Sequence, residues 1–230
     1  LLFMFIRGGV VAAAAGAAVL AAGAASAQEP EVAFNIGVTS DYVYRGFSQT
    51  SEDPALQGGV DVTLGSFYVG AWASNVEFDD DTDGEIDLYG GYRTEAYGYA
   101  FDFGILGYFY PGEPDAADYT YYEFKAAASR AVGPATVGAV VYYSPDIFGV
   151  ADEEAVYYEA NVGFAVSDQW SVSGALGYQT LDVSDDYTTW NIGAGYTIKE
   201  GAVLDFRYHD TDIDTPLSDE RIVASLKIGF

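Results

Sequence analysis

The sequence predicts an all-β protein: a closed antiparallel up-and-down transmembrane β-barrel of about twelve strands, with short periplasmic turns and longer acidic extracellular loops. Three observations lead there. Apolar and polar residues alternate with a period of two, most of the alternating segments are about ten residues long, and the connections between them are alternately long and short. Strands of that length cross a bilayer when they tilt, and alternation gives them one apolar and one polar face.

Residues 1–27 are expected to be a cleaved secretory signal peptide. Arg7 supplies a positive charge, an uncharged apolar run follows from Val10 to Gly23, and Ala25-Ser26-Ala27 matches an A-x-A cleavage site. The alternative is a retained N-terminal helix, but the apolar run is too short to span a bilayer. Residues 28–230 would then form one outer-membrane domain.

The composition excludes several classes of protein. The 230 residues carry 35 acidic and 9 basic side chains, a net charge of −26, which disfavours binding to nucleic acid because phosphates require basic partners. The absence of cysteine rules out disulfides and a lipid anchor on cysteine. With 20 Tyr, 14 Phe and 3 Trp, the chain needs a structure with a large apolar surface, so acidity here does not indicate disorder.

Twelve alternating segments can be placed along the chain. In the last one, Ile222, Ile228 and Phe230 share one face, while Ser225 and Lys227 share the other. The segments are expected at residues 33–45, 55–64, 67–76, 85–94, 97–110, 118–131, 135–144, 154–166, 169–180, 187–199, 201–210 and 221–230.

The connections separate the two ends of the predicted barrel. Long acidic loops are expected at 47–54, 77–84, 111–117, 145–153, 181–186 and 211–220, and tight turns at 65–66, 95–96, 132–134, 167–168 and 200. This asymmetry is typical of outer-membrane barrels, and an even strand number returns both ends of the chain to the periplasm. A soluble two-sheet sandwich is the alternative, but it would point its apolar face inward and does not require the regular change of loop length.

The stretch Ser40-Asp41-Tyr42-Val43-Tyr44-Arg45-Gly46-Phe47-Ser48-Gln49-Thr50, followed by Pro54-Ala55-Leu56-Gln57-Gly58-Gly59, resembles the opening of the TorF-family porins, the Gcw_chp domain family. The segment from Phe67 to Asn75 is similar as well. The resemblance implies an exported barrel provisionally described as a porin. It brings no substrate and no defined site with it.

The polar faces of the strands are expected to line the lumen, with Arg45 at its rim. The lumen-lining candidates are Asp41, Asp61, Asp87, Asp102, Glu123, Lys125, Glu159, Asp205, Arg207, Lys227 and Arg93. Rings of such charges can select the ions that pass a channel. The alternative is that paired charges fill the interior, because twelve strands enclose less space than the 16–18 of an open porin.

Aromatic residues fall into two groups by parity. Those with lumen parity are candidates for ligand stacking: Tyr68, Trp72, Tyr108, Tyr121, Tyr142 and Tyr157. Those near strand ends favour an interfacial girdle over a sugar-binding slide: Tyr42, Tyr44, Tyr143, Tyr158, Trp170, Tyr178, Trp190, Tyr196 and Tyr208.

Other candidate chemistry is weak. Asp79, Asp81 and Asp83 could hold a divalent ion loosely, although Gly90 stands where an EF-hand loop needs Glu, so no firm metal site is predicted. The single histidine, His209, shares the parity of Asp205 and Arg207 and should face the lumen, away from lipid. No catalytic residue, nucleotide motif or cofactor is predicted.

Two functions from different classes stay open. One is a porin for passive diffusion of small hydrophilic, preferentially cationic solutes; the other is a non-transport structural or receptor-like barrel with divalent-binding acidic loops. The expected partners are outer-membrane lipid and lipopolysaccharide, and the barrel-assembly machinery through Phe230, which ends an alternating strand with an aromatic residue. The sequence leaves the oligomeric state undetermined.

Overall fold

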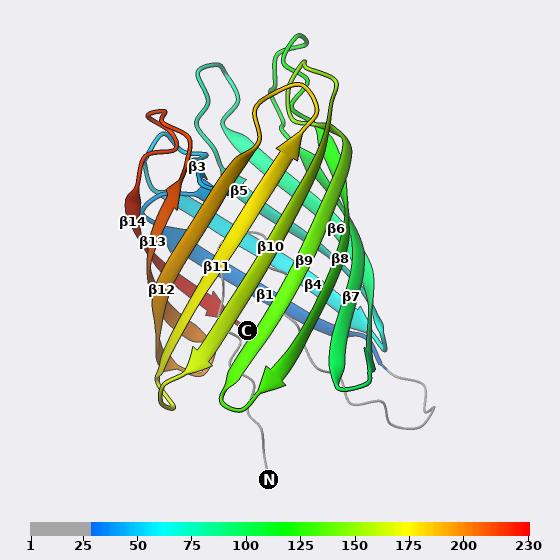
Figure 1. The fold of residues 1–230 in the computed structure, drawn as a ribbon, viewed down its shortest axis with the longest axis vertical. Helices are drawn as coiled ribbons and strands as arrows, with labels where there is room; N and C mark the ends of the chain where they lie inside the picture. Colours follow the sequence, from blue (N-terminus) through cyan, green and yellow to red (C-terminus); the bar gives the residue numbers. More distant parts are fainter. Residues whose placement is uncertain (1–28) are drawn as a thin grey trace.

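The computed structural model describes residues 29–230, so the predicted signal peptide lies outside the described residues. Twelve antiparallel strands follow one another around a closed barrel, as the sequence predicts (Figure 1). They are β1 (Glu31–Thr39), β4 (Ala55–Leu64), β5 (Phe67–Asn75), β6 (Gly84–Ala96), β7 (Tyr99–Phe109), β8 (Tyr121–Val132), β9 (Ala135–Ile147), β10 (Glu153–Ala165), β11 (Trp170–Leu181), β12 (Tyr187–Lys199), β13 (Ala202–Thr211) and β14 (Arg221–Gly229).

The barrel closes where the first strand meets the last. β1 pairs with β14 from Asn35 opposite Gly229 to Thr39 opposite Ser225. Beyond this ladder, Phe34 and Phe230 exchange two backbone hydrogen bonds, 2.8 and 3.0 Å long, and their rings stack at 6.1 Å. Closure leaves no unpaired strand edge among the twelve strands of the barrel, which a lipid environment would not tolerate. Recognition of Phe230 by assembly machinery stays a prediction.

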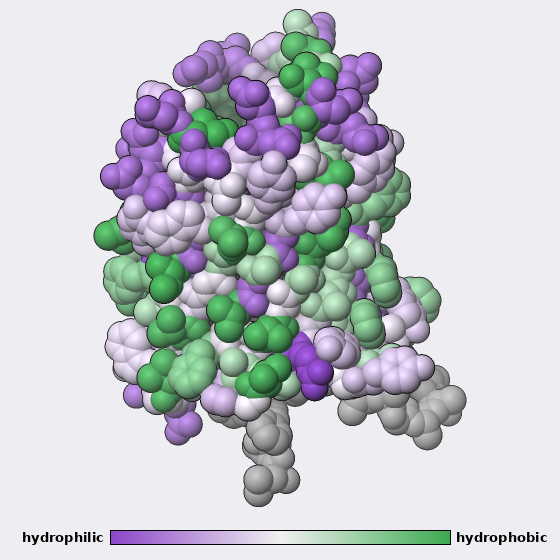
Figure 2. All heavy atoms as spheres, viewed as in Figure 1, coloured by the Kyte–Doolittle hydropathy of each residue, from purple (hydrophilic) through white to green (hydrophobic). Residues whose placement is uncertain are grey.

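The outer wall is apolar and exposed, which is the reverse of a soluble domain. Large apolar side chains such as Leu176 and Phe206 stand 57% and 48% exposed on it. Figure 2 shows green and pale residues over the side of the barrel and purple residues gathered at the end that carries the long loops. An apolar band with a polar cap is the surface that a bilayer requires.

Aromatic side chains on the outer wall lie near both ends of the strands. Trp190 of β12 packs on Tyr208 of β13 at 5.1 Å near the ends that carry long loops. Trp170 of β11 packs on Tyr196 of β12 at 4.9 Å near the opposite ends. These rings therefore lie where an interfacial girdle is expected.

The two ends of the barrel differ, and we call them the loop end and the turn end. Turns of two to four residues close the turn end, at 65–66, 97–98, 133–134, 166–169 and 200–201. The loop end carries the longer connections 76–83, 110–120, 148–152, 182–186 and 212–220. Within residues 29–230, no helix is long and apolar enough to cross a membrane.

The first predicted strand differs from the structure. Alternation suggests one strand over 33–45, but β1 ends at Thr39, and the chain then forms a short hairpin from β2 (Val43–Tyr44) and β3 (Phe47–Ser48). The predicted exposed loop at 47–54 is partly wrong for the same reason, since Ser48 and Thr50 are buried. We call residues 41–50 the inner hairpin, because they fold into the loop end of the lumen.

Candidate functional site: the barrel lumen and its inner hairpin

The inner hairpin reverses in two residues. Arg45 and Gly46 both have positive φ, +46° and +93°, and Tyr44 pairs directly with Phe47. Two consecutive positive φ values define a type I′ turn, whose twist matches that of the flanking strands. An added Cβ at Gly46 would come within 2.9 Å of Thr189 in β12 and Thr211 in β13, so the backbone of the tip lies directly against the wall.

A single carboxylate holds the base of the inner hairpin. Asp41 Oδ1 accepts hydrogen bonds from the hydroxyls of Ser48 at 2.6 Å and Thr50 at 3.1 Å. Its Oδ2 accepts one from Arg221 Nη1 of β14 at 3.0 Å. Asp41 therefore joins the two arms of the hairpin to each other and to the barrel wall, in the stretch that carries the family resemblance.

The tip residue Arg45 crosses the lumen to the opposite wall. Its guanidinium forms two 2.8 Å contacts with the Glu123 carboxylate of β8, and Nη1 also donates to Gln179 Oε1 of β11 at 3.1 Å. Arg45 is 7% exposed and Glu123 is 1% exposed. Burial alone would lower the pKa of Arg45, but the charge of Glu123 raises the pKa well above its usual value, so the guanidinium stays charged.

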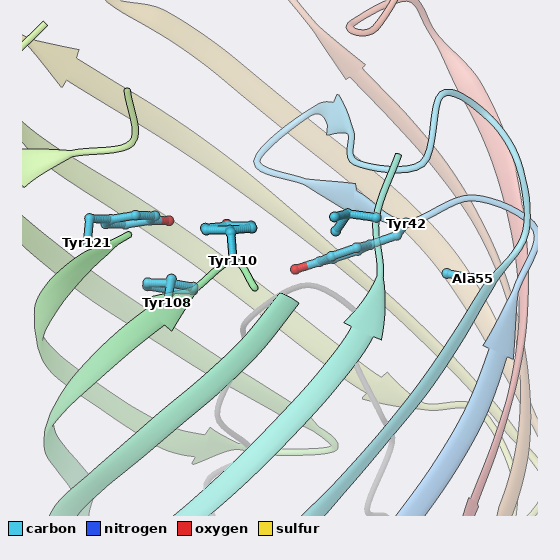
Figure 3. Close-up of a cluster of buried hydrophobic side chains, with 6 residues drawn as sticks. Tyr42, Ala55, Tyr108, Tyr110 and Tyr121 are labelled. Atoms are coloured by element: carbon cyan, nitrogen blue, oxygen red, sulfur yellow. The ribbon is translucent and has the colours of Figure 1, made fainter. Parts of the chain in front are cut away.

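Aromatic rings of the wall surround the rest of the inner hairpin. Tyr42 donates a hydrogen bond to Glu85 of β6 at 3.0 Å, and its ring meets Trp72 of β5 edge to face at 5.4 Å. Figure 3 shows the Tyr42 ring reaching toward Tyr110, with Tyr108 of β7 and Tyr121 of β8 beside them. Burial raises the pKa of the Tyr42 hydroxyl well above its usual value, so this hydroxyl stays neutral.

Nearer the turn end, the Asp102 carboxylate binds two cationic side chains. Asp102 of β7 accepts hydrogen bonds from Lys125 Nζ at 2.8 Å, from Arg93 Nε at 3.3 Å and from the Tyr68 hydroxyl at 2.7 Å. The Arg93 guanidinium lies 3.9 Å from the centre of the Tyr68 ring. This group is a compact ion network rather than an open ring of acids, in line with the alternative that paired charges fill part of the interior.

A second network lies on β13. Arg207 donates to both oxygens of Asp205 at 3.1 and 3.2 Å, to Asn191 at 2.7 Å and to Ser173 at 2.8 Å. Beside it is a cavity of about 10 Å³, room for roughly one water molecule. Its lining residues are Asp41, Val43, Asp205, Arg207, His209, Val223 and Ser225. His209 thus faces the interior.

The remaining lumen-lining candidates also lie on the inner wall. Asp61 accepts a hydrogen bond from Tyr89 at 2.8 Å. Glu159 accepts bonds from Tyr157 at 3.2 Å and Asn161 at 3.1 Å. Register places Asp87 between Trp72 and Tyr108, and Lys227 opposite Gly37 and Val203. The structure brings the candidates together in small groups and not in one ring, and their role in selecting solutes stays a prediction.

Sequence reasoning misplaced the inner hairpin. Arg45 is buried in the lumen and not at the rim, and Tyr42 and Tyr44 are inside the barrel and not in the girdle. The error has one cause: Tyr42 and Tyr44 alternate with Asp41, Val43 and Arg45, so the period of two continues beyond the end of β1. The signal that could have revealed it is the Arg-Gly pair between two short alternating arms, with Asp, Ser and Thr at their bases.

The six aromatic rings predicted to stack on a ligand already pack against other side chains of the protein. Tyr108 and Tyr121 stack on each other at 4.4 Å, and Tyr142 lies 6.4 Å from Tyr157, all beneath or beside the inner hairpin. Tyr68 is covered by Arg93, and Trp72 by Tyr42. Ligand stacking would therefore require Arg93 to leave the Tyr68 ring and the inner hairpin to leave the other rings, and it stays a prediction.

The acidic loop at 76–83 shows ordinary hydrogen bonding. Asp80 accepts bonds from the Thr82 N–H at 2.8 Å and from the Tyr119 hydroxyl at 2.7 Å, which lowers the pKa of this carboxyl group. In the described part of the chain, no three His, Cys, Asp or Glu residues are arranged to hold a metal ion. Weak divalent binding by Asp79, Asp81 and Asp83 stays a prediction.

The fold is that of porin-like outer-membrane barrels. A structure described as KdgM porin superposes with a TM-score of 0.60 at 6% identity, over 86% of this chain and 98% of that one. NanC porin gives 0.54 at 12% identity over 86% and 98%. The COG4313 outer membrane channel from Pseudomonas putida F1 gives 0.50 at 12% identity over 90% and 96%. The chain spans only 62% of another porin, which it matches at 21% identity and a TM-score of 0.45.

Residues 21–227 match the Gcw_chp family, described as a bacterial protein of unknown function, and the chain belongs to that family. No curated protein matches the sequence. The family resemblance that the sequence carries is thereby confirmed, while its TorF name is not tested.

Proposed function

We propose that the protein is an outer-membrane porin through which small hydrophilic solutes diffuse passively, cations in preference to anions. The observation that carries the proposal is the pairing of an apolar, exposed outer wall with an interior lined by Asp102, Lys125, Asp205, Arg207 and their partners. Charged and polar groups on the inner wall can interact with hydrophilic solutes and ions, which an apolar interior would exclude. The likeness to structures described as porins and channels supports the proposal at the level of the fold.

Orientation follows from the same asymmetry. The turn end would face the periplasm and the loop end the outside, as in other bacterial barrels, with lipid and lipopolysaccharide around the wall. Exposed carboxylates of the long loops, among them Asp79, Asp81 and Asp83, would then surround the outer mouth. A negative potential there concentrates cations and repels anions.

The second candidate, a non-transport barrel, is favoured by one observation. The inner hairpin touches Glu85 of β6, Glu123 of β8, Gln179 of β11 and Arg221 of β14, so it reaches walls on opposite sides of the lumen. Transport therefore requires either a path beside the inner hairpin or its displacement.

Conductance of the pure protein in a planar bilayer tests the proposal. We expect reproducible single-channel steps and, across a KCl gradient, a reversal potential of the sign that K⁺ permeation produces. Vesicles with the same protein provide the control for insertion, because the inserted barrel should resist added protease except in its loops. Inserted protein that stays silent at all voltages would favour the non-transport barrel.

A further inference from the structure

The wall of the lumen forms a complete guanidinium-binding pocket around Arg45. Glu123 of β8 holds the guanidinium with both carboxylate oxygens, each at 2.8 Å, and Gln179 of β11 accepts a third bond. A carboxylate that meets a guanidinium through two parallel bonds recognises its planar fork and not only its charge. The pocket is therefore specific in shape as well as in charge.

Aromatic rings complete the pocket. The Arg45 guanidinium carbon lies 4.3 Å from the centre of the Tyr157 ring of β10 and 5.1 Å from that of Tyr142 of β9. Ring faces at this distance attract a cation. An added Cβ at Gly177 of β11 would clash with the Tyr157 side chain, so only a glycine lets this ring lie flat against the inner wall. Four consecutive wall strands, β8 to β11, thus supply the carboxylate, the amide and two of the rings of a cation site, and Tyr44 of the inner hairpin adds a third ring 4.8 Å from the guanidinium carbon.

The other contacts of the inner hairpin with the wall are spread along its length, one or two at each residue, and include a bond from the Glu77 N–H to the Gln49 carbonyl at 2.8 Å. The base of the inner hairpin is held through Asp41 and Arg221, one arm through Tyr42 and Glu85, and the other through the Ser48 N–H, which donates to the Leu217 carbonyl at 2.8 Å. Without Arg45 in place, the buried Glu123 carboxylate would lose its cation, which is unfavourable. Any cation of the right shape that replaces Arg45 removes that penalty.

We propose that the pocket of Glu123, Gln179, Tyr142 and Tyr157 is a binding site for solutes that carry a guanidinium group, and that Arg45 occupies it as a tethered ligand of the same chemistry. A guanidinium solute competes with Arg45, the inner hairpin swings away, and the lumen opens. The part of this inference that concerns conduction rests on the proposed porin function. The competition between Arg45 and the solute does not.

The competition can be measured without conduction. The chain has no cysteine, and Val43 is a buried hairpin residue, so Val43→Cys gives one thiol that a water-soluble maleimide reaches only when the inner hairpin moves. In vesicles, we expect methylguanidinium chloride to speed labelling about tenfold over NaCl of equal concentration, the effect of losing one charge-assisted pair. With Arg45→Ala added, labelling should be fast in both salts.

Two further variants serve as controls. Arg130→Ala removes the same charge from the outer wall, where Arg130 contacts the ring and the hydroxyl of the neighbouring Tyr99. This variant should leave labelling as slow as before. Arg45→Lys keeps a cation but cannot make the two parallel bonds, so its labelling should be intermediate. Slow labelling of the Arg45→Ala protein, or equal rates in both salts with Arg45 present, would overturn the inference.

Conductance then separates this inference from the porin function. If methylguanidinium raises the conductance and Arg45→Ala is permanently high and insensitive, both stand. If methylguanidinium changes neither the conductance nor the labelling rate, the gating by Arg45 is overturned and the proposed porin function still stands. Silence in every variant, with labelling that still responds, overturns the porin and leaves the guanidinium site.

Discussion

The Arg45-Gly46 turn depends on glycine for two separate reasons. Gly46 has φ of +93°, where a side chain is strained, and its missing Cβ leaves room for Thr189 and Thr211. Gly98, at the turn between β6 and β7, shares only the first of these, because its φ is +76° and nothing lies within 4 Å of the Cβ position. The two glycines therefore allow backbone strain to be separated from close approach.

We predict that Gly46→Ala displaces the inner hairpin, whereas Gly98→Ala does not. Both variants should pay about 1–2 kcal/mol for the left-handed backbone, but only Gly46→Ala adds contacts of 2.9 Å with two wall residues. Maleimide labelling of Val43→Cys should become faster in the Gly46→Ala protein alone. Equal rates in the two variants would show that close approach at Gly46 does not hold the tip in place.

At the same scale, period-two parity placed interior residues well and failed only at the hairpin. Asp102, Glu123, Lys125 and Arg207 are buried inside the barrel, as their parity suggests. Arg45 was misplaced because the alternation continues through residue 45, and the Arg45-Gly46 pair indicates a turn but not that the turn folds into the lumen. The decisive contacts, with Glu123 and Gln179, join residues far apart in the sequence and are visible only in three dimensions.

Among the elements, strand bounds followed from alternation wherever both faces differ clearly. The predicted strands at 55–64 and 187–199 coincide with β4 and β12, and most of the others shift by one to three residues. β1 is the exception and ends six residues before the predicted end at residue 45. A strand between lipid and a polar lumen must alternate apolar and polar residues along its whole length. The alternation in the sequence therefore indicates where the strand begins and ends.

A charge on the lipid face should be costly in a strand and harmless in a loop. Leu176 is exposed on the outer wall of β11, between Ala160 of β10 and Trp190 of β12. We predict that Leu176→Arg lowers the free energy of unfolding from lipid vesicles by about 1–3 kcal/mol, between the cost of Arg at the interface and its cost at the bilayer midplane, because Trp190 of the girdle lies beside Leu176. Urea titration followed by tryptophan fluorescence measures this.

Val183 provides the matched control. It is as exposed as Leu176 but lies in the loop between β11 and β12, in water. Val183→Arg should change the free energy of unfolding by no more than about 0.5 kcal/mol, as for other surface substitutions. A similar loss in both variants would mean that the outer wall of β11 does not face lipid.

For the whole molecule, the sequence predicted the closed barrel but not how full its interior is. Twelve strands and their order follow from alternation and loop length, and the structure confirms them. How full the interior is depends on which charged side chains form ion pairs inside the barrel. Asp102 and Glu123, predicted to carry cation selectivity, hold Lys125, Arg93 and Arg45, so much of their charge is neutralised locally. The acids that remain for selectivity are those with neutral partners and those of the loops.

Glu159 and Asp81 represent these two groups of acids. Glu159 lies on the inner wall and is hydrogen-bonded by the neutral groups of Tyr157 and Asn161, so no ion pair described within residues 29–230 offsets its carboxylate beside the proposed solute path. Asp81 is exposed in the loop at 76–83. Salt screens exposed charges strongly, since the Debye length falls from about 10 Å at 0.1 M to 3 Å at 1 M, and it screens partly buried charges much less.

We therefore predict cation selectivity that weakens but persists as salt rises. The measurement is the reversal potential across a fixed KCl ratio, at low and at high absolute concentration. Compared with the unaltered protein, Asp81→Asn should show reduced cation selectivity only at low salt. Glu159→Gln, which removes the same charge from the lumen, should lose selectivity at both. Anion selectivity of the unaltered protein at low salt would contradict the prediction. Selectivity that disappears at high salt would place its origin in the loops alone, because only their charges are fully accessible to screening ions.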